Sequence, residues 1–165
     1  MEQKYRKTGI DWMIATCGGI GYLPKCPGTW GALLALGLWS IGPTCYSPSL
    51  LFTFLCVAIP LSGITILLVL RCTTEKDPSY IVVDEFLGQL LALACIPQIR
   101  IAGFLAFLLF RLFDIKKQGP IRSLDAISKR ASTSPEIAAI CILGDDLLAG
   151  LCAGILVRIT WWLAA

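Results

Sequence analysis

The fold is decided by a run of 45 uncharged residues, 26–70, which reads CPGTWGALLALGLWSIGPTCYSPSLLFTFLCVAIPLSGITILLVL. Only two clusters of turn residues interrupt it, Gly42-Pro43-Thr44 and Ser47-Pro48-Ser49. Because such clusters end helices, the run predicts two apolar helices joined by a tight turn. The first covers about 14 residues from Thr29 to Pro43, and the second runs from Leu50 to Leu70.

The composition of the whole chain agrees with this apolar run. Of the 165 residues, 56% are hydrophobic and only 15% are charged, and the mean hydropathy is +0.76. This leaves too few charges for the surface of a soluble domain. We therefore expect one membrane domain over residues 1–165. A soluble helical protein with a large core is the alternative, which short uncharged runs such as 86–99 allow.

Two further regions predict helices. A second apolar pair runs from about Tyr80 to Lys117 and folds back at Pro97-Gln98-Ile99-Arg100, where proline disfavours helix. A last segment begins at Ser132-Thr133-Ser134-Pro135-Glu136, which offers a capping hydroxyl and a first-turn proline, and ends near Trp161-Trp162. The predicted fold class is an all-α bundle of about five membrane helices.

The basic residues predict its orientation. Cytoplasmic loops carry an excess of Lys and Arg, and with five spans and a cytoplasmic N-terminus only Arg100 and Arg158 lie on the other side. The twelve on the cytoplasmic side are Lys4, Arg6, Lys7, Lys25, Arg71, Lys76, Arg111, Lys116, Lys117, Arg122, Lys129 and Arg130.

Carboxylates inside the apolar segments form one predicted layer. Asp84 lies 13 residues before Pro97, Asp114 14 after Arg100, and Asp145 13 before Arg158. At about 1.5 Å per residue, each is roughly 20 Å from the far edge and close to the cytoplasmic face. Glu85 and Asp146 adjoin this layer, and Thr29 shares its depth. An ionised side chain at the bilayer centre costs roughly 2.5–3.5 kcal/mol, so some interaction must offset it.

Two explanations of these acids remain open. In one, they pair with Arg111, Lys117 or Arg122 as helix-end charges. In the other, they hold a hard cation, Mg²⁺ before Ca²⁺ or Zn²⁺, because the cluster offers oxygen ligands without histidine or CxxC. The glycine-rich stretch 17–31, with basic residues on the same side, favours a phosphate near that cation.

Several enzyme classes are excluded. The chain has no histidine, which removes Ser-His-Asp, Cys-His and histidine-ligated zinc mechanisms. The eight cysteines form no CxxC pair, so we expect them to be buried packing residues. Cys152 and Arg158 have the spacing of a cysteine phosphatase, but the residues between them are apolar and mid-helix. No nucleotide-binding GxxxxGK[ST] motif occurs.

Four motifs occur in order along the chain: 24–31 (PKCPGTWG), 83–88 (VDEFLG), 110–114 (FRLFD) running on to Lys117 and 120–122 (PIR), and 144–150 (GDDLLAG). Together they resemble the phosphatidylglycerophosphatase A family from about Asp11 to Ile159. One departure is Gln118, where members of that family carry a second proline.

The resemblance implies a Mg²⁺-dependent phosphatase in a bacterial inner membrane, with its active site at the cytoplasmic face. It would remove the terminal phosphate of phosphatidylglycerophosphate to give phosphatidylglycerol. By analogy, the Mg²⁺ ligands, direct or through water, would be Asp84, Glu85, Asp114, Asp145 and Asp146. Asp125 would be a further ligand or the base that positions water. The phosphoryl oxygens would be neutralised by Lys25, Thr29, Lys117 and Arg122.

Adjacent acids on a helix point about 100° apart, so we expect one of each pair to reach the metal. The expected partners are a phospholipid substrate and the lipid bilayer, without nucleic acid. Two rival functions remain: a cation carrier or channel, with acids spread through the membrane depth, and a protein that only binds anionic lipid and needs the basic residues alone.

Overall fold

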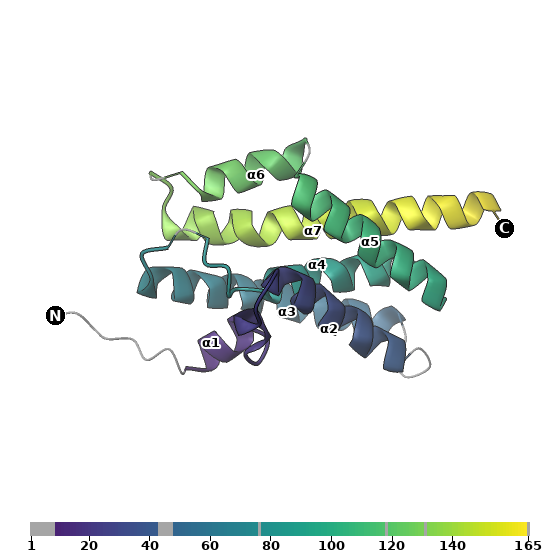
Figure 1. The fold of residues 1–165 in the computed structure, drawn as a ribbon, viewed down its shortest axis with the longest axis horizontal. Coiled ribbons are helices and arrows are strands. Elements are labelled where there is room, and N and C mark those ends of the chain that lie inside the picture. The colour runs from purple at the N-terminus through teal and green to yellow at the C-terminus, as the bar shows by residue number, and fades with distance from the viewer. Residues whose placement is uncertain (1–8, 43–47, 76, 118, 131, 165) are drawn as a thin grey trace.

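The computed structural model describes residues 9–42, 48–75, 77–117, 119–130 and 132–164, and within these ranges it contains helices and no strand. The elements are α1 (Ile10–Ala15), the 3₁₀ turn η1 (Ile20–Tyr22), α2 (Pro27–Ile41), α3 (Pro48–Cys72), α4 (Val83–Ala94), α5 (Arg100–Lys116), α6 (Pro120–Ser128) and α7 (Pro135–Ala164) (Figure 1). Predictions that fall on Lys4, Arg6, Lys7, Pro43, Ser47, Lys76 and Gln118 lie outside the described residues.

The all-helical fold class is confirmed. The five predicted segments correspond to α2, α3, α4, α5 and α7, and α2 and α7 each begin at a proline. Proline suits the first turn because the N–H that it lacks has no partner there. The separate short helices α1 and α6 were not predicted. Helix α6 lies beside the N-terminal half of α7, and α5 crosses its C-terminal half (Figure 1).

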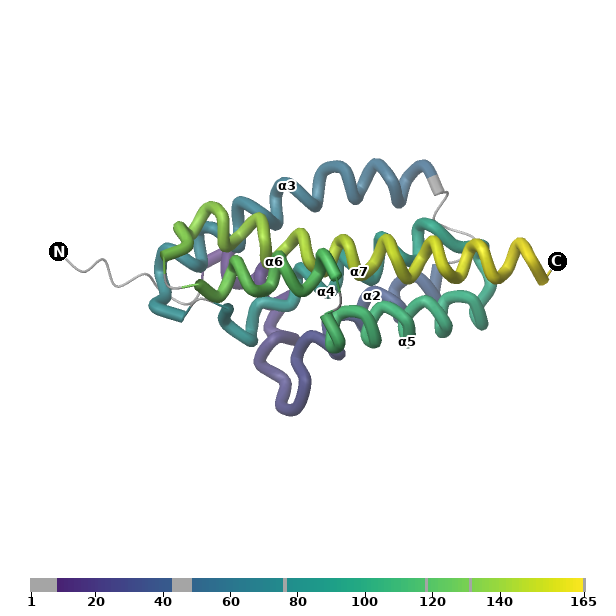
Figure 2. Tube along the Cα trace, turned by 90° about the horizontal axis from the view of Figure 1, so that it is seen from above, coloured from purple at the N-terminus to yellow at the C-terminus, as the bar shows by residue number. Residues whose placement is uncertain are grey.

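Helix α4 is at the centre of the bundle and packs most extensively against α7 and α2. Two glycines allow α4 and α7 to approach closely. A Cβ at Gly88 would meet the backbone carbonyl of Asp146, and a Cβ at Gly150 would meet that of Gly88. Small residues permit such backbone contact between apolar helices. Seen from above, α7 lies between α3 and α5 (Figure 2).

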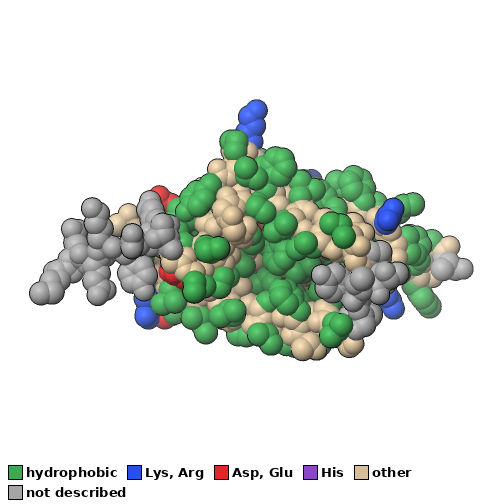
Figure 3. All heavy atoms as spheres, turned by 90° about the horizontal axis from the view of Figure 1, so that it is seen from below, with side chains coloured by type: hydrophobic (Ala, Val, Ile, Leu, Met, Phe, Trp, Pro, Cys, Tyr) green, Lys and Arg blue, Asp and Glu red, His purple; other side chains and the backbone are tan. Residues whose placement is uncertain are grey.

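The face seen in Figure 3 is largely apolar, with charged side chains toward its two ends and one basic side chain that projects from its upper edge. Exposed apolar side chains include Phe52 and Val57 on α3, Phe104 on α5 and Ile155 on α7. Two helices are long and apolar enough to cross a membrane, Ser49–Cys72 and Pro135–Ala164. Helices α2, α4 and α5 have 15, 12 and 17 residues, which corresponds to about 18–26 Å, less than the roughly 30 Å of a bilayer core.

The expectation that the cysteines are buried is wrong for most of those described. Cys26, Cys56, Cys72 and Cys152 are exposed, and Cys141 alone of the described cysteines is fully buried. Three of the exposed thiols lie on α3 and α7, the two helices long and apolar enough to cross a membrane. Apolar sequence context does not distinguish a buried position from one that faces lipid, because both favour the same residues.

Candidate active site

A cavity of about 400 Å³ opens where the beginnings of α2 and α4, the end of α5, helix α6 and the middle of α7 meet. The six acids that the sequence singles out all line it: Asp84, Glu85, Asp114, Asp125, Asp145 and Asp146. They come from four helices, α4, α5, α6 and α7. The fold therefore collects residues that are up to 62 positions apart in the sequence into one polar space.

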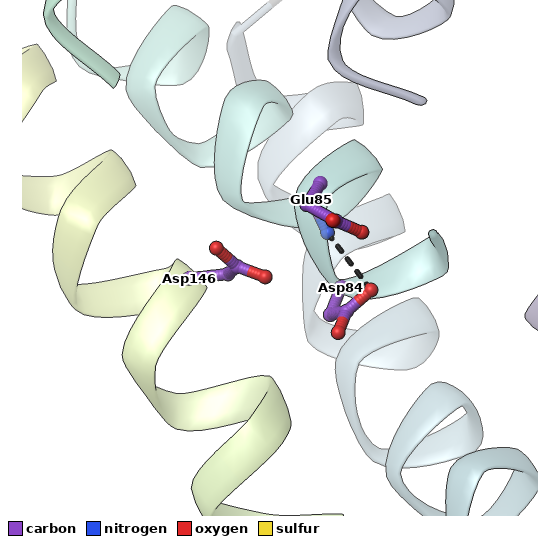
Figure 4. Close-up of side chains that lie close together, drawn as sticks. All are labelled: Asp84, Glu85 and Asp146. Carbon is purple, nitrogen blue, oxygen red and sulfur yellow. Dashed lines mark hydrogen bonds between the residues drawn. The ribbon is translucent and has the colours of Figure 1, made fainter. Parts of the chain in front are cut away.

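Three of these acids form the tightest cluster. One carboxylate oxygen each from Asp84, Glu85 and Asp146 lies within 4.8 Å of the others (Figure 4). Asp84 and Asp146 are buried, and Glu85 is partly buried. The Glu85 backbone N–H donates to Asp84 Oδ1 at 3.1 Å, whereas the buried oxygens Glu85 Oε2 and Asp146 Oδ1 have no hydrogen-bond partner among the described residues.

Helix packing brings the cluster together. Because Gly88 and Gly150 let α4 and α7 touch, Asp146 on α7 lies opposite the first turn of α4. On the other side of α4, Gly28 in the first turn of α2 leaves room for Glu85, since a Cβ at Gly28 would collide with Glu85 Oε1. The glycines are thus part of the geometry that places carboxylates side by side.

Asp145, which is next to Asp146 on α7, has a different partner. Asp145 Oδ2 accepts a hydrogen bond from Lys117 Nζ at 2.7 Å, and the same ammonium group donates to Asp125 Oδ1 at 2.6 Å. Lys129 Nζ also bonds Asp125 at 2.6 Å and lies 3.3 Å from Asp77 Oδ2. Burial alone would raise the pKa of Asp125, but the two lysines lower it, so this carboxylate is ionised at neutral pH.

Asp114 pairs with Arg111 one turn earlier on α5, at 2.6 Å. Both side chains are largely buried, and the guanidinium also lies 5.9 Å from the centre of the Phe110 ring. The first sequence explanation, ion pairing, therefore holds for part of the group, and the cation explanation stays a prediction. Asp114 and Asp145 pair with cations, whereas Asp84, Glu85 and Asp146 have no ion-pair partner within 4 Å among the described residues.

Of the four predicted phosphate-binding residues, one lines the cavity. Lys117 lines the cavity, whereas Lys25, Thr29 and Arg122 are not among its lining residues. Lys25 is next to Cys26, which does line it, and Arg122 is one turn before Asp125 on α6. Their roles stay predictions.

In the glycine-rich turn before α2, several backbone N–H groups donate hydrogen bonds within the same segment of the chain. Those of Gly18, Gly19, Gly21 and Tyr22 bond to carbonyls between Met13 and Gly19, so they are not free to cradle an anion. The expected phosphate site in the stretch 17–31 also includes the first turn of α2, where Gly28 lines the cavity, so that expectation stays a prediction.

Sequence reasoning missed three features of this cavity. The sequence predicts Arg111 only as an ion-pair partner and topology marker, yet it lines the cavity beside the acids. Its spacing of three from Asp114, one helical turn, was the available signal. Asp77 also lines the cavity, and no periodic pattern marks it because it precedes α4 in an irregular segment. The role of Gly28 depends on its contact with Glu85, 57 positions later in the chain, and no pattern in a single sequence predicts such a contact.

Cysteine chemistry finds no support in this geometry. The segment from Cys152 to Arg158 is continuous helix within α7, so it offers no loop of free N–H groups to a phosphate. Burial, and then the nearby carboxylates Asp84 and Glu85, raise the pKa of the Cys17 thiol to about 12, which keeps it protonated.

Comparisons with known proteins agree with the four motifs. The family model described as phosphatidylglycerophosphatase A matches residues 13–161. A Haemophilus influenzae protein named phosphatidylglycerophosphatase A is 34% identical over 158 residues, 92% of this chain and 89% of that protein. An Escherichia coli protein of the same name is 32% identical over 161 residues, 91% of this chain and 84% of that protein.

A third relative carries another name. A Bacteroides thetaiotaomicron protein, provisionally named a phosphatidylinositol-3-phosphatase, is 34% identical over 164 residues, 95% of this chain and 97% of that protein. No solved structure matches the chain with comparable significance. Because the family model and two relatives of that name each span nine-tenths of the sequence, the chain belongs to the phosphatidylglycerophosphatase A family.

Proposed function

We propose that this chain is a Mg²⁺-dependent phosphatase that removes the terminal phosphate of phosphatidylglycerophosphate, giving phosphatidylglycerol and inorganic phosphate. Family membership and the names of two relatives support the phosphatase activity and the phospholipid substrate. The reaction forms a bond from a water oxygen to phosphorus, breaks the phosphorus–oxygen ester bond and returns a proton to the glycerol oxygen.

The observation that carries the metal proposal is the cluster of Asp84, Glu85 and Asp146. Two of its buried carboxylate oxygens lack any hydrogen-bond partner among the described residues, and a cation would satisfy them. An all-carboxylate donor set suits a hard cation, so the residues fit Mg²⁺. A bound Mg²⁺ would supply polarisation of the phosphoryl oxygens and activation of water.

The cavity's own cations suit the phosphoryl group. Lys117 and Arg111 lie on its wall with the acids, and fixed positive charge stabilises the charge that spreads over the phosphoryl oxygens during transfer. Lys25, Thr29 and Arg122 are proposed to add to this field from the neighbouring surface.

The remaining acids have positioning roles in this proposal. Asp145 and Asp125 hold the Lys117 ammonium between them, and Asp114 holds Arg111. Asp114 and Asp145 would therefore reach a metal through water. Because the lysines lower the pKa of Asp125, this carboxylate suits accepting a hydrogen bond from a water molecule better than taking its proton.

For the membrane we propose five helices, α2, α3, α4, α5 and α7, in a bacterial inner membrane, with the cavity at the cytoplasmic face. Asp145 lies 19 residues before the end of α7, or about 28 Å, which approaches the thickness of a bilayer core. The three helices shorter than the core all border the cavity.

A carrier or channel is less favoured. That function predicts acids spread through the membrane depth, whereas all six acids line one cavity and three of them lie within 4.8 Å. A protein that only binds anionic lipid would have no use for a buried group of unpaired carboxylates.

The experiment that tests the proposal is phosphate release by the purified protein, with phosphatidylglycerophosphate and phosphatidylinositol 3-phosphate as parallel substrates, with Mg²⁺ and with chelator. We expect Mg²⁺-dependent release from phosphatidylglycerophosphate. Preference for the phosphoinositide would move the substrate assignment toward the name of the Bacteroides relative. Equal release in chelator would refute the metal dependence.

A further inference from the structure

A second cavity, of about 370 Å³, lies between α2, α3 and α4 and is lined only by apolar side chains. Its floor is formed by Trp39 and Leu90, which are buried, and its rim by Leu38, Leu50 and Phe54, which are exposed. We call this cavity the α2–α4 groove. The Trp39 ring rests against Gly103 of α5, where a Cβ would collide with it, so this wall is held firmly.

The groove and the polar cavity lie on the same two helices, α2 and α4, and have lining residues that are adjacent in sequence on α4. On α4, Glu85 lines the polar cavity and the next residue, Phe86, lines the groove. On α2, Gly28 lines the polar cavity and Leu38 the groove, ten residues or about 15 Å further along. A molecule with a phosphate at one end and a hydrocarbon chain at the other has the polarity that this pair of cavities presents.

The direction of the groove matches a lipid that enters from the cytoplasmic leaflet. From the acids, α2 and α4 run toward the opposite face in the proposed orientation, and the groove follows them to the beginning of α3 at Leu50. When the phosphate of such a lipid lies among the acids, its acyl chains point into the bilayer, which is the direction in which the groove runs.

A further apolar cavity, between α3 and α7, does not share this direction. Its α7 lining residues run from Leu147 back to Glu136, so it extends from the level of the acids toward the proposed cytoplasmic end. An acyl chain placed there, with its phosphate among the acids, would point away from the bilayer centre. This α3–α7 groove therefore serves as a matched control.

We propose that the α2–α4 groove binds an acyl chain of the lipid substrate, an inference that rests on the proposed function. Lipid tails are as apolar as leucine, so a chain that leaves the bilayer for the groove gains little hydrophobic free energy. The groove's contribution is to orient the substrate so that its phosphate meets the acids, and small displacements of a reacting group are costly.

The test measures how kcat/KM depends on chain length, with dibutanoyl, dihexanoyl and dioctanoyl phosphatidylglycerophosphate below their micellar concentrations. Leu50→Trp and Leu38→Trp fill the groove from two helices. The control, Ile64→Trp, lies on the same helix as Leu50 and at similar exposure, 56% against 59%, but lines the α3–α7 groove. All four proteins are measured in the same detergent. Partition of the longer chains into the detergent around the protein therefore affects each protein equally and cancels when the variants are compared.

Because these short-chain substrates reach the groove from water and not from a bilayer, we expect the wild type and Ile64→Trp to gain up to about fourfold per methylene that reaches the groove. Both groove variants should lose the long-chain advantage, so that their dioctanoyl-to-dibutanoyl ratio falls about tenfold or more. Two groove variants are used so that a folding defect in one of them cannot by itself explain the loss. The same ratio in all four proteins would overturn the groove proposal and leave the phosphatase activity standing, whereas no hydrolysis of any chain by the wild type would refute the proposed function itself.

Discussion

The metal proposal predicts that Asp146→Asn stabilises the protein in the absence of metal and abolishes its response to Mg²⁺. Asp146 lies beside two other carboxylates and one of its oxygens is buried without a partner. Asparagine keeps the size of the side chain and removes the negative charge. The substitution therefore relieves repulsion in the metal-free protein and weakens the site that would bind the cation.

The separation of the carboxylates sets the size of this effect. Two full charges no more than 4.8 Å apart repel by at least about 3.5 kcal/mol at an effective dielectric constant of 20. Carboxylates this close share protons, so we expect a net gain of about 1–3 kcal/mol, or roughly 2–10 °C in Tm for a chain of this size. Mg²⁺ at a hundred times its Kd should stabilise the wild type by about 2.7 kcal/mol and the variant by almost nothing.

Two other substitutions have the opposite sign. Asp114→Asn leaves the largely buried Arg111 without its carboxylate, and Asp145→Asn removes one of the two acids that hold Lys117. Uncompensated buried charge costs up to about 3–5 kcal/mol. These variants should melt at lower temperature whether or not Mg²⁺ is present. Asp84→Asn, from the unpaired cluster, should follow Asp146→Asn.

Thermal melts in chelator and in Mg²⁺, together with turnover, measure these differences. The control is Glu136→Gln, which removes an exposed carboxylate whose partner, Arg71, is outside the cavity. It should keep the wild-type response to Mg²⁺, while turnover of Asp146→Asn falls on the order of a hundredfold or more. Equal destabilisation of Asp146→Asn with and without Mg²⁺ would refute the reasoning, because it is the behaviour of a structural ion pair.

Three further predictions follow from the structure. Replacing all eight cysteines by serine should leave turnover within roughly tenfold in folded protein, since no thiolate takes part; loss of activity in Cys152→Ser alone would reopen cysteine chemistry. Gly28→Ala should lower turnover at least about tenfold and weaken the thermal response to Mg²⁺, because the added Cβ displaces Glu85; an unchanged Mg²⁺ response would show that Glu85 is not a ligand. In a cysteine-free parent, a cysteine at position 129 should react with a membrane-impermeant reagent from the cytoplasm and one at position 100 from outside; cytoplasmic labelling at both would contradict the five-helix arrangement.

The helices were predictable because their signals are local. Uncharged runs predicted α2 from Thr29 and α3 from Leu50, two residues after their observed starts, and the first-turn proline at 135 predicted the start of α7, since hydrophobic length and first-turn proline act within one segment. The short helix α6 was not predicted as a separate element. Ile121, Leu124 and Ile127 repeat at helical spacing, but nine residues are too few for that spacing to predict a stable helix, and packing against α7 stabilises it.

The candidate site was predictable at the level of which acids meet, because depth along a helix follows from counting residues. Which acid faces which partner was not predictable, since this depends on how each helix is rotated. Asp145 and Asp146 do divide as the 100° offset suggests, one toward Lys117 and the other toward α4. Asp84 and Glu85 both stay in the cluster, because Asp84 turns back to the Glu85 N–H and the longer Glu85 side chain reaches across.

The charge of the cavity gives an independent reason to expect a cation. Seven carboxylates line it, the six acids together with Asp77, against the two cations Arg111 and Lys117 among the described residues. A phosphate monoester brings roughly two more negative charges at neutral pH, so the ionised cavity alone would repel the group that the proposed reaction requires. A divalent cation held by Asp84, Glu85 and Asp146 reverses the sign of that interaction at the point of contact. Substrate phosphate and metal should therefore bind with positive cooperativity: inorganic phosphate should inhibit or stabilise the protein only when Mg²⁺ is present. Phosphate binding of equal strength in chelator would mean that Lys117 and Arg111 suffice, and that the carboxylates serve another purpose.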